Sequence, residues 1–284
     1  MTRPRWTGVG GAVVPSLGRL AGYTLLVSLA LLVLAPVVWT VLSSFKTPAE
    51  LALRPPRLLP AEFAATNYVD ALGRFNFLLY LRNSVLVTVA ATLLTLVVNV
   101  LAAYALAKYN FRGRTTVFLV ILGTVMVPIQ VIFIPVYQVV SDLGLVNSLW
   151  GLIIPAAATP TGVFLLRQYL LTIPDELIEA ARIDGAGELR IFLRIVLPLC
   201  RPALAVVAIF SVVWRWNDFL WPLVVAQDEQ TYTLQVALAR FAGEEVVPFN
   251  LILAMSVVTM APVLVVFLVV QRQIVQGVAV TGFK

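Results

Sequence analysis

The sequence predicts an all-α, polytopic membrane protein with six transmembrane helices and a helical hairpin in the cytoplasm. Hydrophobic residues make up 61% of the 284 residues and charged residues only 12%, and the mean hydropathy is +0.96. Apolar runs of about twenty residues, the length that a helix needs to cross a bilayer, recur along the chain. The composition excludes a soluble globular protein. The spacing of the runs indicates one transmembrane domain over 21–284, preceded by a tail over 1–20.

Cysteine and histidine usage limits the chemistry that the chain can carry. Cys200 is its only cysteine, and it has no histidine, so neither a disulfide within the chain nor a Cys/His metal site is possible. We predict no catalytic residue and no metal ligand. The formal net charge of +6 is interpreted as flanking charge that sets membrane topology, and not as a sign of nucleic-acid binding.

The N-terminal part predicts a tail, a span and an outer segment. Residues 1–20 carry three arginines and no acid, which is typical of a cytoplasmic tail. The first span is expected at 21–42. A cleaved signal peptide is the alternative, but the apolar run is too long and no Ala-x-Ala site follows it. The polar, proline-rich segment 43–82 is expected on the outer face.

The middle of the chain predicts two spans joined by a basic turn. The second span is expected at 84–106 and the third at 116–139, with the acid-free turn 108–114 between them in the cytoplasm. Pro128 and Pro135 lie in the third span. Because proline removes a helical hydrogen bond, we expect a kinked helix inside the bundle.

The C-terminal half predicts three more spans, at 149–171, 203–225 and 251–270. The last two are separated by 227–249, which carries four acidic residues and is expected on the outer face, followed at the end by a short cytoplasmic tail. This outer loop is either a solvated connection or a surface for a partner.

The longest polar interruption of this half, 172–202, predicts two short amphipathic helices. Thr172 is expected to cap the first helix, and Gly185 to end it in the left-handed conformation. The expected apolar faces are Leu177, Ile178 and Ala181 in the first helix, and Leu189, Phe192, Leu193 and Val196 in the second. A simple connector would need only a handful of residues, so we interpret this hairpin as a docking surface for another chain.

Positive charge supports the orientation with both termini inside. The inside segments hold Arg3, Arg5, Arg19, Lys108, Arg112, Arg114, Arg167, Arg182, Arg190, Arg194, Arg201, Arg272 and Lys284, whereas the outside segments hold only Lys46, Arg54, Arg57, Arg74, Arg82 and Arg240. The same bias places the hairpin in the cytoplasm.

The hairpin resembles the EAA loop of ABC-importer permeases. The matching positions are Glu179, Ala180, Ala181, Asp184, Gly185, Ala186, Phe192, Ile195, Leu197, Pro198 and Pro202. About ten residues at fixed spacing are more specific than a short motif. Other stretches resemble the carbohydrate-importer branch of the family, and within it the six-span subunit typified by the maltose permease: 83–84, 102–107, 126–128, 143–145 and 216–220. A chance amphipathic hairpin is the alternative.

The resemblance implies a type I importer fold whose hairpin docks in a cleft of a cytoplasmic ATPase. It implies that Glu179 pairs with a basic group of that ATPase, with Ala180, Ala181, Asp184, Gly185, Ala186 and Gly187 around it. The alternative for Glu179 is a pair with Arg182 in its own helix, worth about 0.2–0.5 kcal/mol. The chain has no GxxxxGK[ST] loop, so ATP and Mg are expected on an ATPase dimer. A second permease subunit, as a heterodimer, an extracytoplasmic solute-binding protein and membrane lipid complete the expected partners.

Arg215 and Asp218 are the only charges expected deep in a span, where each costs about 2.5–3.5 kcal/mol. Their i, i+3 spacing would let them pair, and intramembrane charges mark transport paths. Trp214, Trp216, Asn217 and Trp221 surround them in sequence. Indole faces stack on sugars and amides bond hydroxyls, so these residues are candidates for a translocation path. The alternative is an aromatic belt with an ion pair that holds the bundle.

The function expected from the resemblance is a permease subunit of an ATP-driven importer in a bacterial or archaeal cytoplasmic membrane. It would move a sugar or sugar-like solute by alternating access. An ABC permease for another solute, such as glycerol phosphate, is the first alternative. An ion-coupled secondary transporter is the second, with Asp218 as its thin support. An intramembrane enzyme is the least supported, because Cys200 has no neighbouring base to activate it.

Overall fold

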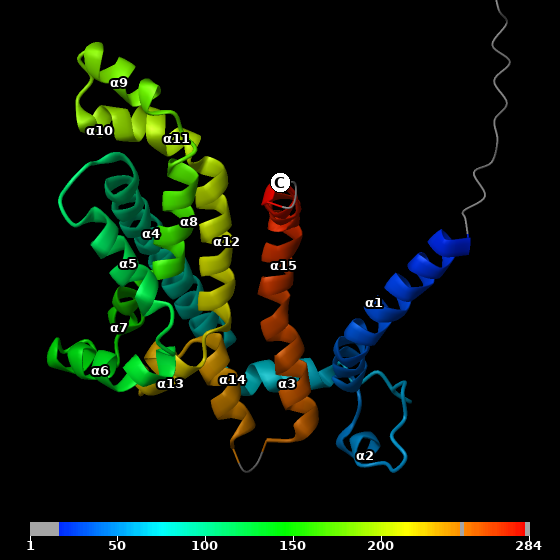
Figure 1. Cartoon of the computed structure of the whole chain (residues 1–284). Coiled ribbons are helices and arrows are strands. Elements are labelled where there is room, and N and C mark those ends of the chain that lie inside the picture. Colours follow the sequence, from blue (N-terminus) through cyan, green and yellow to red (C-terminus); the bar gives the residue numbers. More distant parts are fainter. Residues whose placement is uncertain (1–16, 245–246, 282–284) are drawn as a thin grey trace, which may run out of the picture.

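The computed structural model describes residues 17–244 and 247–281, and Figure 1 shows them as helices and connecting loops. These residues contain no strand, which confirms the all-α class. Most of the expected N-terminal tail, 1–16, and the last three residues lie outside the described range. The first helix, α1 (Leu17–Ser43), begins four residues earlier than expected.

The centre of the fold is α4 (Phe77–Lys108), which packs against α8 (Pro160–Leu170) and α12 (Arg201–Asn217). α4 begins seven residues before the expected start of the second span. Polar side chains at helical spacing form a buried stripe along it: Asn83, Ser84, Thr88, Thr92, Thr95 and Asn99. Thr92 shares a hydrogen bond of 2.9 Å with Ser211 of α12. Such bonds between helices stabilise packing where the surroundings are apolar.

The third span is not a continuous helix, contrary to the sequence prediction. α5 (Arg114–Thr124) and α6 (Ile129–Asp142) meet at 103°. Pro128 precedes α6 at the break, where it cannot donate a hydrogen bond and disfavours helical backbone at the residue before it. The predicted kink is therefore confirmed, but as a full break.

The fourth and fifth spans are also bent or shortened. α7 (Leu149–Ile153) with the 3₁₀ turn η1 (Ile154–Ala156) meets α8 at 42°. The fifth span was expected to reach residue 225, but α12 ends at Asn217 and α13 (Leu220–Val225) follows separately. The physical reason is Asp218, whose extended backbone (ψ 124°) interrupts the helix.

Two helices of the described residues, α1 from Ala21 and α4, are single helices long and apolar enough to cross a membrane. Counting each of three bent pairs as one span raises that number to five. The third pair joins 188–199 to α12 at 74°. α15 (Phe249–Thr281) adds a shorter apolar stretch over Phe249–Val265, and its helix runs well past the expected end of the sixth span at 270.

The two predicted outer segments contain helices, which the sequence analysis missed. Segment 43–82 contains α2 (Pro48–Leu51) and α3 (Thr66–Arg74). Segment 227–249 contains the 3₁₀ turn η3 (Glu229–Thr231) and α14 (Leu234–Ala242). α14 forms because one of its faces is buried, at Leu234, Val236, Ala237 and Phe241.

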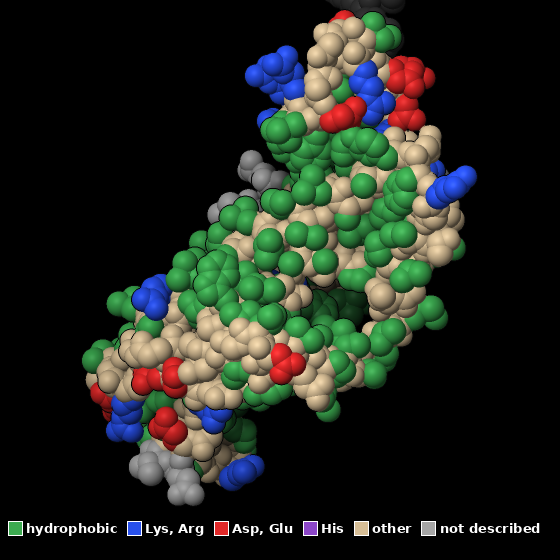
Figure 2. Space-filling view, turned by 90° about the vertical axis from the view of Figure 1, so that its left-hand side faces the viewer, with side chains coloured by type: hydrophobic (Ala, Val, Ile, Leu, Met, Phe, Trp, Pro, Cys, Tyr) green, Lys and Arg blue, Asp and Glu red, His purple; other side chains and the backbone are tan. Residues whose placement is uncertain are grey.

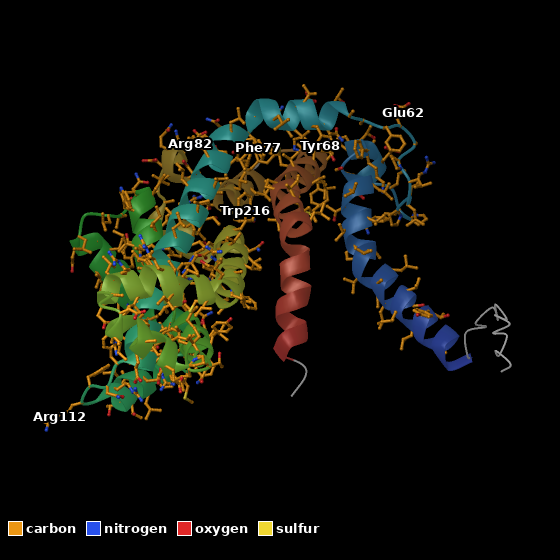
Figure 3. The ribbon with its side chains drawn as sticks, turned by 90° about the horizontal axis from the view of Figure 1, so that it is seen from above. Glu62, Tyr68, Phe77, Arg82, Arg112 and Trp216 are labelled. Carbon is orange, nitrogen blue, oxygen red and sulfur yellow. The ribbon has the colours of Figure 1, made fainter. Side chains whose placement is uncertain are left out.

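α1 leans away from the bundle, and Figure 3 shows α3 bridging from the bundle towards it. The side chains of α1 are exposed along nearly its whole described length. Its C-terminal end is held by α3: Ser44 Oγ lies 2.6 Å from Tyr68 Oη, and Asn67 Nδ2 donates to Ser44 O at 2.8 Å.

The molecule has two ends (Figure 1). The hairpin, the turn 109–113 and the C-terminal end of α15 lie at one, called the hairpin end here, and α3, α6, α13 and α14 lie at the other, the opposite end. Each end has its own apolar cluster. The hairpin-end cluster includes Tyr104, Leu166, Ile178, Ile191 and Val196, and the opposite-end cluster includes Phe75, Tyr80, Trp216, Leu234 and Met255.

Candidate coupling hairpin and translocation path

The hairpin consists of α9 (Asp175–Ile183), α10 (Glu188–Ile191), the π-helix η2 (Phe192–Val196) and α11 (Leu197–Leu199). Thr172 does not cap α9, contrary to the prediction. Its Oγ1 donates instead to Tyr169 O, at 2.7 Å, because Thr172 still belongs to the turn that ends α8. Pro174 occupies the cap position.

The predicted left-handed residue at the end of α9 is confirmed. Gly185 has φ +78°. Ala186 N donates to Ala181 O at 2.9 Å, and Gly185 N donates to Arg182 O at 3.0 Å. These two bonds are the Schellman arrangement, which satisfies the last carbonyls of a helix and favours glycine. Gly185 therefore sets the elbow between the two limbs of the hairpin.

The apolar faces of the hairpin differ from those expected. Ile178, Ile191, Phe192 and Val196 are buried against α4 and α8, whereas Leu177, Ile183, Leu189 and Leu193 are exposed. In the second limb the prediction assumed 3.6 residues per turn throughout, but η2 is wound more loosely, which changes which of its residues face inward. The hairpin thus presents apolar side chains outward beside its charges.

The predicted coupling residues lie on the outer surface of the hairpin. Glu179, Ala180, Asp184, Gly185 and Gly187 are exposed, and Ala181 and Ala186 are half-buried. Figure 2 shows acidic and basic side chains gathered at this end, above a largely hydrophobic middle. Among the described residues, Glu179 has no hydrogen bond or ion pair.

The alternative partner for Glu179 is not supported, because Arg182 is engaged elsewhere. Arg182 Nε donates to Glu188 Oε1 at 2.7 Å, and Nη2 donates to Glu188 Oε2 at 3.3 Å. Arg182 and then Tyr109 hold the pKa of the Glu188 carboxyl below its usual value. Glu188 in turn raises the pKa of Arg182. Hydrogen bonding to Glu188, with partial burial, raises the pKa of Tyr109.

Arg215 and Asp218 do not form the predicted ion pair within the described structure. Arg215 Nη2 donates to Ala156 O at 3.2 Å, and its buried Nε has no partner among the described residues. Asp218 lies beyond the end of α12, so the helical i, i+3 geometry does not apply to it. Its carboxylate accepts a long hydrogen bond of 3.5 Å from Trp221 N.

The predicted path residues near Arg215 and Asp218 do not lie on one common surface. Trp216 is buried in the opposite-end cluster, to which Phe77 also packs (Figure 3), whereas Trp214 is 63% exposed. Trp221 is a packing residue: its Nε1 donates to Gly151 O at 3.0 Å. Asn217 is exposed, and its amide donates to Val213 O of its own helix. The bond to Ala156 O therefore holds Arg215 at the break before α8, whereas the side chains of Trp214 and Trp216 lie in different surroundings, one exposed and the other buried.

Sequence reasoning missed the polar stripe of α4. Thr95 Oγ1 donates to Ala156 O at 2.6 Å, the carbonyl that Arg215 also contacts. The recurrence of polar residues every three or four positions between 83 and 99 was a readable signal of one helix face.

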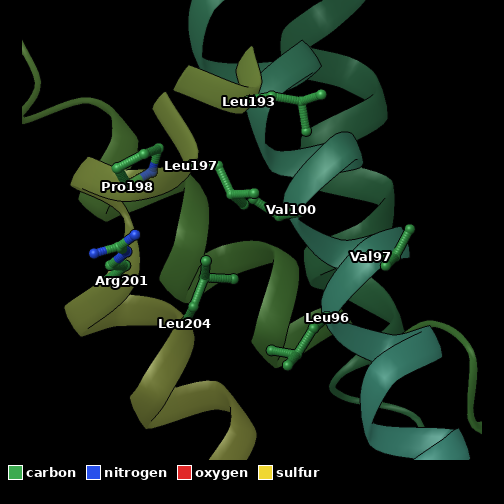
Figure 4. Close-up of a pocket in the computed structure, with 8 residues that line it drawn as sticks. All are labelled: Leu96, Val97, Val100, Leu193, Leu197, Pro198, Arg201 and Leu204. Atoms are coloured by element: carbon green, nitrogen blue, oxygen red, sulfur yellow. The ribbon is translucent and has the colours of Figure 1, made fainter. Parts of the chain in front are cut away.

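An apolar groove of about 370 Å³ opens beside the hairpin, between α4 and the joint of α11 with α12. Figure 4 shows its leucines and valines facing one another, with Arg201 at the edge. Its lining residues are Leu96, Val97, Val100, Leu193, Leu197, Pro198, Arg201 and Leu204.

The chain matches a protein family over residues 99–280. That family is described as "Binding-protein-dependent transport system inner membrane component". The matched range includes α8, the hairpin and α12.

Named relatives are similar over nearly their whole length. An arabinooligosaccharides transport system permease protein of Halalkalibacterium halodurans is 35% identical, over 90% of this chain and 93% of the relative. A diacetylchitobiose uptake system permease protein of Streptomyces coelicolor is 35% identical, over 92% and 88%. An sn-glycerol-3-phosphate transport system permease protein of Agrobacterium fabrum is 32% identical, over 93% and 97%.

A solved structure has the same fold. It is the crystal structure of a bacterial ABC transporter involved in the import of the acidic polysaccharide alginate. One of its chains superposes with a TM-score of 0.81 at 28% identity, covering 90% of this chain and 96% of that chain.

Proposed function

This chain belongs to the family of binding-protein-dependent transport-system inner membrane components and is a permease subunit of an ABC importer. On this basis we propose how the chain works and which class of solute it transports. The relatives that match most of its length are permease proteins of transport or uptake systems. The observation that carries the mechanism is the hairpin: an exposed, charged elbow, fixed by Gly185, on a chain that has no phosphate-binding loop of its own.

The partner at the hairpin is a cytoplasmic ATPase that binds ATP and Mg. Its cleft receives α9, and a basic group of the ATPase pairs with Glu179. Two features support this: Glu179 is exposed and has no described partner, and Leu177 and Ile183 beside it expose apolar surface that water disfavours. A second permease subunit and an extracytoplasmic solute-binding protein complete the importer.

The hairpin end faces the cytoplasm, and both termini lie on that side. Support comes from the basic segment 108–114, the hairpin segment 172–202 and the C-terminal end of α15, which lie together in Figure 1 and carry most of the positive charges assigned to the inside. The opposite end, with α3 and α14, then meets the binding protein.

The solute is a sugar or an oligosaccharide. The named sugar-importing relatives support this class. We place the path beside Arg215 and Asp218, because polar groups inside a bundle mark solute pathways and Arg215 donates to Ala156 O in the bent segment before α8. ATP closes the ATPase dimer, the hairpin moves with its ATPase subunit, and the cavity opens outward to accept the solute. Hydrolysis resets it.

A phosphorylated polyol such as glycerol phosphate is the second candidate. The glycerol-phosphate relative supports it, as does Arg215, a partly buried cation without an acidic partner in the described structure, whose buried Nε has no hydrogen bond there. A guanidinium binds phosphate by two parallel hydrogen bonds.

Uptake by cells that express the complete importer tests the function. The probes are labelled arabinooligosaccharide, diacetylchitobiose and glycerol 3-phosphate. The uptake of each is measured in untreated cells, in cells whose proton or sodium gradient is collapsed, and in cells treated with vanadate. The proposal expects uptake of a saccharide that vanadate stops and gradient collapse does not. Uptake that follows the proton or sodium gradient would refute an ATP-driven importer, and uptake of glycerol 3-phosphate alone would establish the second candidate.

A further inference from the structure

We propose that α4 is the lever that joins the hairpin to the opposite end of the molecule, and that Lys108 and Tyr109 are the positioning residues that clasp the hairpin to it. This inference rests on the proposed function, because it concerns how a displacement of the hairpin reaches the solute path. Four groups of contacts carry it.

The first contact joins α4 to the start of the hairpin. Lys108 Nζ donates to Ile173 O and to Asp175 Oδ1, each at 2.6 Å. The Lys108 side chain is 3% exposed, whereas that of Asp175 is 72% exposed. Lys108 ends α4 and Asp175 begins α9, so each charge also lies at the helix end that favours it. A buried ammonium needs these acceptors, which ties the two helices together.

The second contact joins the same place to both limbs of the hairpin. Tyr109 Oη donates to Glu188 Oε2 at 2.5 Å. Glu188, on α10, also accepts two hydrogen bonds from Arg182 on α9. One carboxylate therefore holds three segments: the end of α4, the first limb and the second limb.

The turn after α4 is itself fixed, so Tyr109 cannot swing freely. Arg114 Nη1 donates to Tyr109 O at 3.2 Å and to Asn110 Oδ1 at 3.0 Å. Tyr104 packs edge-on against Tyr109, with ring centroids 5.4 Å apart, and against Phe192 of the hairpin at 5.2 Å. The clasp is thus backed by packing as well as by hydrogen bonds.

The far end of α4 holds the segment that leads into α14. Asn83 Nδ2 donates to Gln230 O at 2.8 Å and to Tyr232 O at 3.0 Å. Ser84 Oγ accepts from Leu234 N at 2.8 Å. One helix of 32 residues is therefore hydrogen-bonded to the hairpin at one end and to the opposite-end segment at the other. A rigid element fixed at both ends transmits a displacement in either direction.

The clasp is tested first on the purified chain, by hydrogen exchange of the backbone amides over 175–191. The variants are Tyr109→Phe, which removes one oxygen, and Lys108→Met. Arg112→Met is the matched control, because Arg112 projects from the same turn (Figure 3) and has no described partner. Losing a hydrogen bond to a charged group should accelerate exchange about tenfold. Unchanged exchange in both clasp variants would overturn the proposal, whatever the chain transports.

The lever is tested in the assembled importer, by the stimulation of ATP hydrolysis on adding the solute-binding protein. We expect both clasp variants to retain the ATPase, with the stimulation of ATP hydrolysis reduced at least fivefold. We expect Lys108→Arg and Arg112→Met to behave as wild type. A clasp that only supported the fold would lower ATPase retention and leave the stimulation per bound ATPase unchanged, which would overturn the lever. Failure of the wild type to bind any ATPase would refute the proposed function instead.

Discussion

Asn99 of α4 holds the first turn of α8 through Thr159. The Asn99 amide donates to Thr159 Oγ1 at 2.6 Å, and its carbonyl oxygen accepts from Thr159 N at 3.1 Å. Thr159 is the N-cap residue of α8, and its side chain makes no capping bond. Asn99 of the neighbouring helix instead binds the backbone N–H of Thr159, the group that an N3 side chain binds in a capping box. The break between η1 and α8 is thereby fixed from α4, within the bundle.

Asn99→Ala is expected to destabilise the protein. It removes both bonds and leaves the partly buried N–H of Thr159 without a described partner, which costs about 1–3 kcal/mol. Reversible unfolding of the purified protein in detergent measures the change. Asn76→Ala is the control, since Asn76 is exposed and makes no capping bond. Equal stability of the two variants would show that the Asn99 contact contributes nothing.

Gly162→Ala is expected to disturb the same contact from the other side. A Cβ at this position would lie 2.1 Å from Asn99 Nδ2 and 2.6 Å from Thr159 Oγ1. Asn99 is fully buried, so it cannot move away without losing its bonds. Gly123→Ala, in α5, meets no atom within 4 Å and should be neutral or slightly stabilising. A lower unfolding midpoint for Gly162→Ala alone is the expected result, and equal midpoints would contradict the close approach.

Gly185→Ala should loosen the hairpin, whereas Gly187→Ala should not. A Cβ meets nothing within 4 Å at either position, so the difference isolates the backbone: φ is +78° at Gly185 and −71° at Gly187. Left-handed backbone costs about 1–2 kcal/mol for a residue with a Cβ. Gly185→Asn should lose less, because asparagine tolerates this region. Amide exchange over 175–191 ranks the three variants, and an equal effect of both alanines would refute the elbow.

Lowering the pH should weaken the hydrogen bonds that the Glu188 carboxylate accepts from Arg182 and Tyr109. The pKa of Glu188 is depressed below its usual 4.5, mainly by Arg182. An acid with a depressed pKa stabilises the folded state above pH 4.5, and the stabilisation disappears as the pH falls through the folded-state value. The unfolding midpoint should therefore fall more between pH 6 and pH 3 in the wild type than in Glu188→Gln. A parallel decline in the two proteins would contradict this role for Glu188.

Local sequence signals predicted the turn at Gly185, whereas the angles between the helices of the bent pairs depend on tertiary packing. Gly185 could be predicted because the end of an amphipathic pattern and a glycine coincide. Pro128 predicted a missing helical bond, but not the 103° between α5 and α6, since proline leaves the direction of the next segment to packing. The predicted ion pair between Arg215 and Asp218 was wrong because it assumed that the helix continues through Asp218, whereas α12 ends at Asn217.

The sequence contained a signal for α14 that the prediction of a loop over 227–249 overlooked. Leu234, Ala237 and Phe241 have helical spacing, and they form the buried face of α14 in what was predicted as a loop. The bond between Tyr109 and Glu188 was out of reach, because the two residues are 79 positions apart and no local pattern relates them.

Co-purification tests the central claim most directly, with the wild type and Glu179→Lys solubilised gently and their companions identified by mass spectrometry. We expect the wild type to bring down a second permease and an ATPase with a phosphate-binding loop. We expect Glu179→Lys to bring down the permease without the ATPase. Asp70→Lys, an exposed charge reversal on α3 at the opposite end, should retain both. A wild type that purifies alone as a homo-oligomer, or a Glu179→Lys variant that keeps its ATPase, would contradict the docking of an ATPase at Glu179.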